Sequence, residues 1–207
     1  MSAAGFEAKP SAMPQPRKGP AGWWDRLVGP GMTVGETLLV LGSGVAGAVY
    51  AAATLGAAHA AVWKIALAAL IAFDVIGGAV CNATATTRAW YGRQGYRRLS
   101  RFGFAAAHLA YVALVAWVFR GPAFDLAYLE IAGGALAGSA VIVAVASPRL
   151  RHPVAFAAWL ASVFAVAGTV GLTAHLEWFF PVLMLKLVIG HLGADGDDAP
   201  PQKDVHG

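Results

Sequence analysis

The apolar run over residues 61–83 is long enough to cross the hydrocarbon core of a membrane, which takes about 17 to 25 residues as a helix. Other stretches of the chain are similar, and globular core helices are shorter. Of the 207 residues, 58% are hydrophobic and 13% are charged, against roughly 25% charged in soluble domains. The sequence therefore predicts an all-α, integral membrane bundle rather than a soluble domain.

Six transmembrane helices are expected, over residues 33–55, 61–83, 102–119, 124–146, 153–175 and 178–192. Pro153 suits the first residue of the fifth helix. The sixth run has 15 residues, which is short for a perpendicular crossing. Three regions follow: a disordered or interfacial N-terminal tail (1–32), the six-helix domain (33–192) and a disordered acidic C-terminal tail (193–207).

The basic residues predict the orientation of the bundle. With six spans, twelve of the fifteen Lys and Arg residues fall on one side and only Arg120 on the other, while Lys64 and Lys186 lie within apolar runs. By the positive-inside rule both termini are then cytoplasmic. Topology explains the net charge of +4, so we expect no nucleic-acid partner. The single cysteine, Cys81, excludes an intrachain disulfide and a multi-cysteine metal site.

A carboxylate in the second apolar run is the strongest sign of function. Asp74 lies near mid-membrane, where a charge costs on the order of 3 kcal/mol and usually faces a protein interior or a wet cavity. Helical spacing puts Gly77, Gly78, Cys81 and Asn82 on its face. Lys186, at a similar depth in the last run, is its natural partner. The pair would be a structural ion pair, a proton or ion relay, or a substrate anchor.

Further polar residues lie toward the cytoplasmic half of the predicted bundle. Glu36, Asn82, His108 and His191 would form that part of a route to Asp74 and Lys186. His191 follows Lys186 by five residues, which puts it on another face of a regular α-helix unless the helix is deformed. His108 and His191 could alternatively bind haem. We predict no metal site, and because no catalytic constellation is visible, an enzyme is the less favoured class.

Two segments together resemble a known group of proteins. The first has Asp74, Gly77 and Gly78, followed by Asn82-Ala83-Thr84, and the second has Leu185-Lys186-Leu187 followed by Gly190-His191. They resemble uncharacterised bacterial multi-pass inner-membrane proteins with a D-x-x-G-G to N-A-T helix and a terminal L-K-L-x-x-G-H helix. The resemblance covers about a quarter of the chain. It implies a bacterial cytoplasmic membrane protein and no particular activity.

Three functions remain open from the sequence. The leading hypothesis is transport of protons, an ion or a small solute through the polar seam that includes Asp74 and Lys186. The alternatives are a haem-binding or redox membrane protein that uses His108 and His191, and a non-catalytic assembly or scaffold protein whose polar residues specify packing. The lipid bilayer is the expected partner, no cofactor is predicted outside the haem alternative, and a homo-oligomer is left open.

Overall fold

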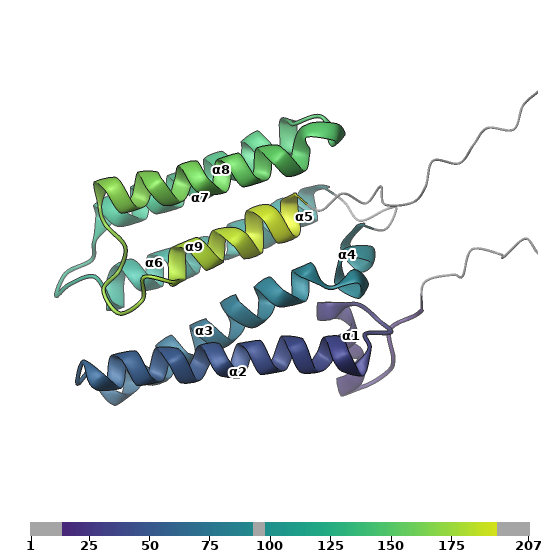
Figure 1. Ribbon diagram of the computed structural model, residues 1–207, viewed down its shortest axis with the longest axis horizontal. Coiled ribbons are helices and arrows are strands. Elements are labelled where there is room, and N and C mark those ends of the chain that lie inside the picture. The colour runs from purple at the N-terminus through teal and green to yellow at the C-terminus, as the bar shows by residue number, and fades with distance from the viewer. Residues whose placement is uncertain (1–13, 93–97, 194–207) are drawn as a thin grey trace, which may run out of the picture.

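The computed structural model describes residues 14–92 and 98–193, and between 98 and 102 the backbone alone (Figure 1). All regular secondary structure in these ranges is helical. In chain order the elements are α1 (Pro20–Val28), α2 (Val34–Ala57), α3 (Val62–Ala83), α4 (Ala85–Gly92), α5 (Arg98–Ala107), α6 (Leu109–Val118), α7 (Leu126–Val145), α8 (Pro148–Thr169), α9 (Phe179–Met184) and a π-helical segment, η1 (Leu185–Leu192).

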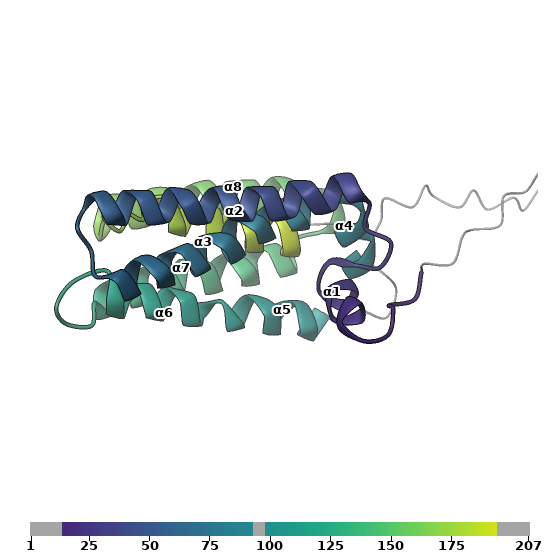
Figure 2. The same ribbon diagram turned by 90° about the horizontal axis from the view of Figure 1, so that it is seen from below.

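The longer elements run side by side along one axis and alternate in direction (Figures 1 and 2). Helices α5 and α6 lie in line, separated only at His108, and α9 continues directly into η1. Helices α2, α3, α7 and α8 are long and apolar enough to cross a membrane, and the ranges Gly103–Val118 and Phe179–Leu192 are shorter apolar helices. The predicted all-α fold is confirmed for these residues, and the four long apolar helices indicate a membrane protein.

The fifth predicted span has wrong boundaries. Helix α8 begins at Pro148, so Pro153 lies inside it, and it ends at Thr169 rather than near His175. Pro148 takes the first helical position, where a missing N–H costs nothing. Ser147 precedes it in extended conformation, as the residue before a proline prefers.

The N-terminal region, expected to be a disordered or interfacial tail, contains helix α1, which packs against α4 in the predicted loop. The last carbonyls of a helix have no partner within it. Side chains of α4 supply donors to three of them: Trp90 Nε1 to Arg26, Tyr91 Oη to Leu27 and Thr87 Oγ1 to Val28. Disorder is therefore wrong for residues 20–28. The predicted acidic tail after Gly193 lies outside the described residues, as do residues 93–97.

Close packing of α2 on α3 depends on glycines. A Cβ on Gly47 would lie 2.5 Å from Ile76 Cδ1, and one on Gly44 would lie 3.0 Å from the Phe73 ring. Gly77 of α3 faces the α2 backbone, where its Cβ would be 3.2 Å from the Val40 oxygen. Small residues allow membrane helices to approach in this way. The packing fixes the face of α3 that carries Asp74.

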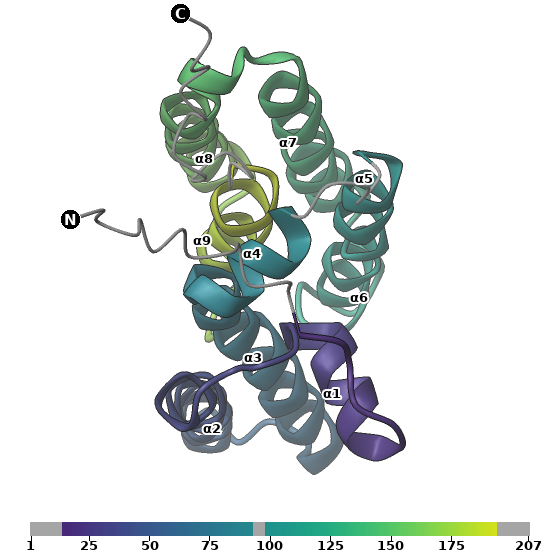
Figure 3. The same cartoon turned by 90° about the vertical axis from the view of Figure 1, so that its right-hand side faces the viewer.

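The short last helix is the centre of the bundle. Figure 3 shows α9 and η1 enclosed by α3, α7 and α8. Phe179, Leu183, Met184, Leu187 and Val188 are fully buried. At about 1.5 Å per residue its 14 residues span no more than about 21 Å. Neighbouring helices shelter this short helix from the surroundings of the bundle.

The loop before α9 is held by Arg120. Its guanidinium donates to the carbonyls of Val170 and Gly171 at 2.6 and 3.1 Å and to Asp125 Oδ2 at 2.7 Å. The hydrogen bond from Arg120 lowers the pKa of the Asp125 carboxyl, which also caps α7 through the Tyr128 N–H at 2.9 Å. Irregular backbone thus receives the donors that it needs next to the apolar helices.

Candidate functional site

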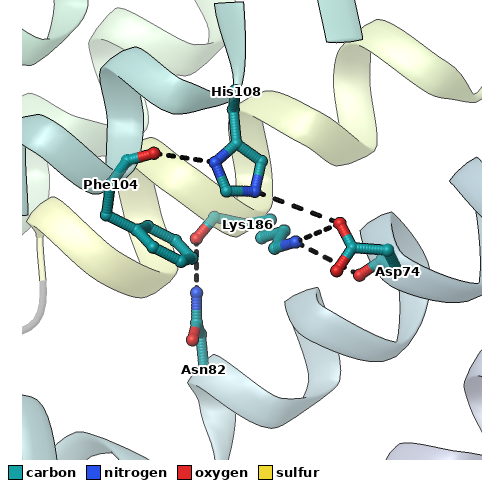
Figure 4. A network of polar contacts seen from close by, with 5 residues as sticks. All are labelled: Asp74, Asn82, Phe104, His108 and Lys186. Carbon is teal, nitrogen blue, oxygen red and sulfur yellow. Dashed lines mark hydrogen bonds and ion pairs between the residues drawn. The ribbon is translucent and has the colours of Figure 1, made fainter. Parts of the chain in front are cut away.

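Asp74 of α3 and Lys186 of η1 form an ion pair between the apolar helices (Figure 4). The Lys186 ammonium lies 2.7 Å from Asp74 Oδ2 and 3.2 Å from the Asp74 carbonyl. The two side chains differ in access, because that of Lys186 is 4% exposed and that of Asp74 is 44% exposed. The cation is therefore enclosed by protein, whereas the carboxylate has an open side.

Gly78 makes room for the lysine. A Cβ at this position would lie 2.5 Å from Lys186 Cε and 2.8 Å from Nζ. The lysine stem therefore crosses α3 one turn after Asp74, and its ammonium turns back to the carboxylate. The Asp-x-x-Gly-Gly pattern has a physical meaning here, because Gly77 admits α2 and Gly78 admits Lys186.

His108 lies at the break between α5 and α6 and faces the same carboxylate (Figure 4). Its Nδ1 is 2.8 Å from the Phe104 carbonyl, which can only accept, so Nδ1 carries a proton. In the neutral ring Nε2 is then an acceptor, and it lies 4.0 Å from Asp74 Oδ2. Because both atoms are acceptors, one additional proton can be bound by either the imidazole or the carboxyl group.

The last helix is deformed where it carries its polar residues. Leu185–Leu192 is π-helical, and the Gly193 N–H donates to the Val188 carbonyl five residues earlier at 2.8 Å. With i to i+5 bonding, residues five apart lie on one face. Lys186 and His191 are five apart and 3% exposed each, so the deformation brings both inward. The expectation that His191 lies on another face holds only for a regular α-helix.

Asn82 joins α3 to the π-helical segment. Its amide nitrogen donates to the Lys186 carbonyl at 2.9 Å, and both residues are buried. A Cβ on Gly190 would lie 2.8 Å from Asn82 Cβ, so the two elements are in close contact there. Asn82 thus holds the backbone of Lys186, while Asp74 holds its side chain.

Glu36 has a different place from the one that the sequence suggested. It forms a capping box with Thr33 at the start of α2, and its carboxylate accepts hydrogen bonds from the Thr86 N–H and hydroxyl at 3.2 and 2.8 Å. These contacts tie α2 to α4 and do not involve Asp74 or Lys186. The reason is local, since a threonine followed three residues later by glutamate is itself a helix-start signal.

Phe104 is the site residue that sequence reasoning missed. Its ring centroid is 4.6 Å from that of His108 and 4.5 Å from that of His191, and Lys186 Nζ is 5.9 Å away. The signal was its position one helical turn before His108. The Tyr111 ring of α6 also lies beside His108, with the two ring centroids 5.5 Å apart.

A haem or metal held by both histidines fits this arrangement poorly. The Phe104 ring contacts both imidazoles, so joining them through one iron would require the ring to move away. Within residues 14–92 and 98–193 there is no group of three His, Cys, Asp or Glu side chains that could hold a metal ion.

No protein family, no curated protein and no solved structure matches the chain.

Proposed function

We propose that this membrane protein moves protons across the bilayer, alone or coupled to an ion or small solute, with the Asp74 carboxylate as the group that binds and releases the proton. One observation carries the proposal. A single carboxylate oxygen lies 2.7 Å from the Lys186 ammonium and 4.0 Å from His108 Nε2, in largely apolar helices.

The unequal access of the two charges favours transport over a purely structural pair. A pair that only fixes helix packing is best enclosed on both sides, because water weakens its attraction. Here the lysine is buried, whereas the rest of the protein covers the carboxylate only in part. Ionisable residues within membrane helices commonly mark proton or substrate routes.

Proton binding would be coupled to the position of Lys186. Protonation of Asp74 removes the negative charge that attracts the ammonium, which leaves a buried cation without its counter-ion. The system then returns the proton, passes it to His108 or moves the lysine. A carrier needs such a linkage, because proton binding must change the structure that controls access.

We further propose six transmembrane passes with both termini in the cytoplasm of a bacterium. Support comes from the charge distribution, from the resemblance of the two motif segments, and from α1, α4 and the end of η1, which lie at the same end of the bundle (Figure 1). Lys18→Cys and Ala123→Cys in a Cys81→Ala background test this. A membrane-impermeant thiol reagent added to intact cells should label position 123 alone, and labelling of position 18 would reverse the orientation.

Proton uptake into vesicles tests the main proposal. Purified protein is reconstituted with a pH-sensitive dye inside, and a potassium diffusion potential drives protons inward. Wild-type protein should acidify the interior faster than empty vesicles, and Asp74→Asn should abolish the difference. Candidate ions and solutes are then added in turn to find a coupled species.

Glu130→Gln is the matched control. It removes the same charge from another apolar helix, α7, where the Glu130 side chain is exposed. It should acidify vesicles like the wild type. Equal rates for wild type, Asp74→Asn and empty vesicles under every gradient would leave the assembly or scaffold role as the better description.

A further inference from the structure

A small cavity opens at the α4 end of the bundle, beside His191. Its volume is about 10 Å³, and its polar lining comes from Asn82 and His191, which are buried, from Thr87 and Tyr91, and from Arg88, which is exposed at the rim. That volume corresponds to about one water molecule, and a buried water needs two to four polar partners. The cavity has this volume, its lining includes polar side chains, and Arg88 lies exposed at its rim.

The π-helical segment connects this cavity to the ion pair. It places His191 and Lys186 on one face of the helix, one turn apart, with His191 nearer the α4 end. The Phe104 ring contacts both the His191 ring and the His108 ring. The Tyr91 ring contacts the His191 ring edge-on, with centroids 5.2 Å apart. A histidine therefore lies between a surface cavity of water size and the candidate proton site.

We propose that this cavity binds one water molecule or hydronium ion and that His191 takes up the proton there for delivery to His108 and Asp74. The inference rests on the proposed function and adds the route by which protons reach the site from the α4 end. A hydronium ion in the cavity gives its proton to an imidazole nitrogen and remains as water. The imidazolium then gives the proton to His108 Nε2 or the Asp74 carboxylate and becomes neutral again.

Arg88 on α4 lies at the rim of the same cavity, Lys186 lies one turn away on the same helix, and Tyr91 is the neighbouring phenol, among the residues whose side chains are described. The Phe104 ring separates the two histidines, so transfer requires this ring to turn aside, which prevents a continuous leak.

Chemical rescue tests the proposal in the vesicle assay. His191→Ala should lower proton uptake about 100-fold, the usual size of a lost proton-transfer group. Imidazole added at millimolar concentration should restore uptake, because the small variant side chain leaves room for it. Less basic substituted imidazoles should shift the pH dependence of the rescued rate downward, which a purely structural role of His191 would not produce.

Two further variants complete the design. His152→Ala removes an exposed histidine at the same end of the bundle, in the first turns of α8, and should leave uptake unchanged. His191→Gln keeps a polar side chain of similar size and should be inactive without rescue, which covers the case in which His191→Ala does not fold.

The outcomes separate this inference from the proposed function. If Asp74→Asn abolishes uptake while His191→Ala and His191→Gln transport like the wild type, His191 takes no part and only the inference fails. Folded His191→Ala that is inactive and not restored by any imidazole also overturns it. Wild-type protein that takes up no protons removes the proposed function itself.

Discussion

The side chain of Lys186 crosses Gly78 so closely that a Cβ atom there would lie 2.5 Å from its Cε. Gly78→Ala should therefore move the ammonium away from Asp74 and lower both stability and proton uptake. Gly134→Ala in α7 is the control, because nothing lies within 4 Å of its Cβ position. There alanine should stabilise by up to about 1 kcal/mol. Thermal unfolding in detergent measures the stability of the two variants, and the vesicle assay measures their proton uptake. Equal effects of the two substitutions on stability would contradict the close contact.

Removal of the lysine charge should destabilise the bundle. Lys186→Met leaves Asp74 unpaired, and we expect a loss of about 2 kcal/mol, less than the roughly 3 to 5 kcal/mol of a fully buried pair because the carboxylate has an open side. Asp74→Asn combined with Lys186→Met should recover most of the loss. Unfolding free energies of the two single variants and the double variant give the coupling. Additive losses would mean that the two charges do not stabilise each other.

Glu36 should matter for stability and not for transport. Glu36→Ala breaks the capping box and the bonds to Thr86, so we expect a loss of about 1 kcal/mol. Glu36→Gln preserves the capping geometry, since glutamine serves at this position. Both variants, compared at equal amounts of folded protein in vesicles, should take up protons like the wild type. Impaired uptake in Glu36→Gln would restore the relay role that the sequence suggested.

The contact of Arg17 with Asp25 predicts a pH dependence at the N-terminal end. Side-chain hydrogen bonds from Arg17, at 2.7 and 2.9 Å, lower the pKa of Asp25 from 3.8 to about 2. A lowered carboxyl pKa stabilises the folded contact above the unfolded value, so the contribution is complete above about pH 4 and is lost as the pH falls toward 2. A spin label at Lys18→Cys should become more mobile over this range, and Asp25→Asn should abolish the pH dependence of its mobility.

The sequence predicted the features that follow from a single general rule, such as the length of an apolar run. Apolar length gave the helices, and two charges at similar depth in apolar runs suggested Asp74 and Lys186 as partners, whose role stays a prediction. His191 was assigned to another face because spacing arguments assume 3.6 residues per turn, and a π-helical segment changes that number. The relay interpretation of Glu36 used only its charge near the membrane and not its local capping pattern with Thr33. Phe104 is apolar, so no charge or motif marked it.

The π-helical segment also changes how this helix should respond to losing a residue. A π turn closes over one residue more than an α turn, so five positions connect Lys186 to His191 where four would suffice. Deletion of Ile189 should let the segment relax to an α-helix with the lysine and the histidine still on one face, whereas deletion of Leu70 from α3 should rotate Asp74 away from its partners. The extra residue therefore lets the central helix lose one position beside the ion pair and still keep Lys186 and His191 on one face.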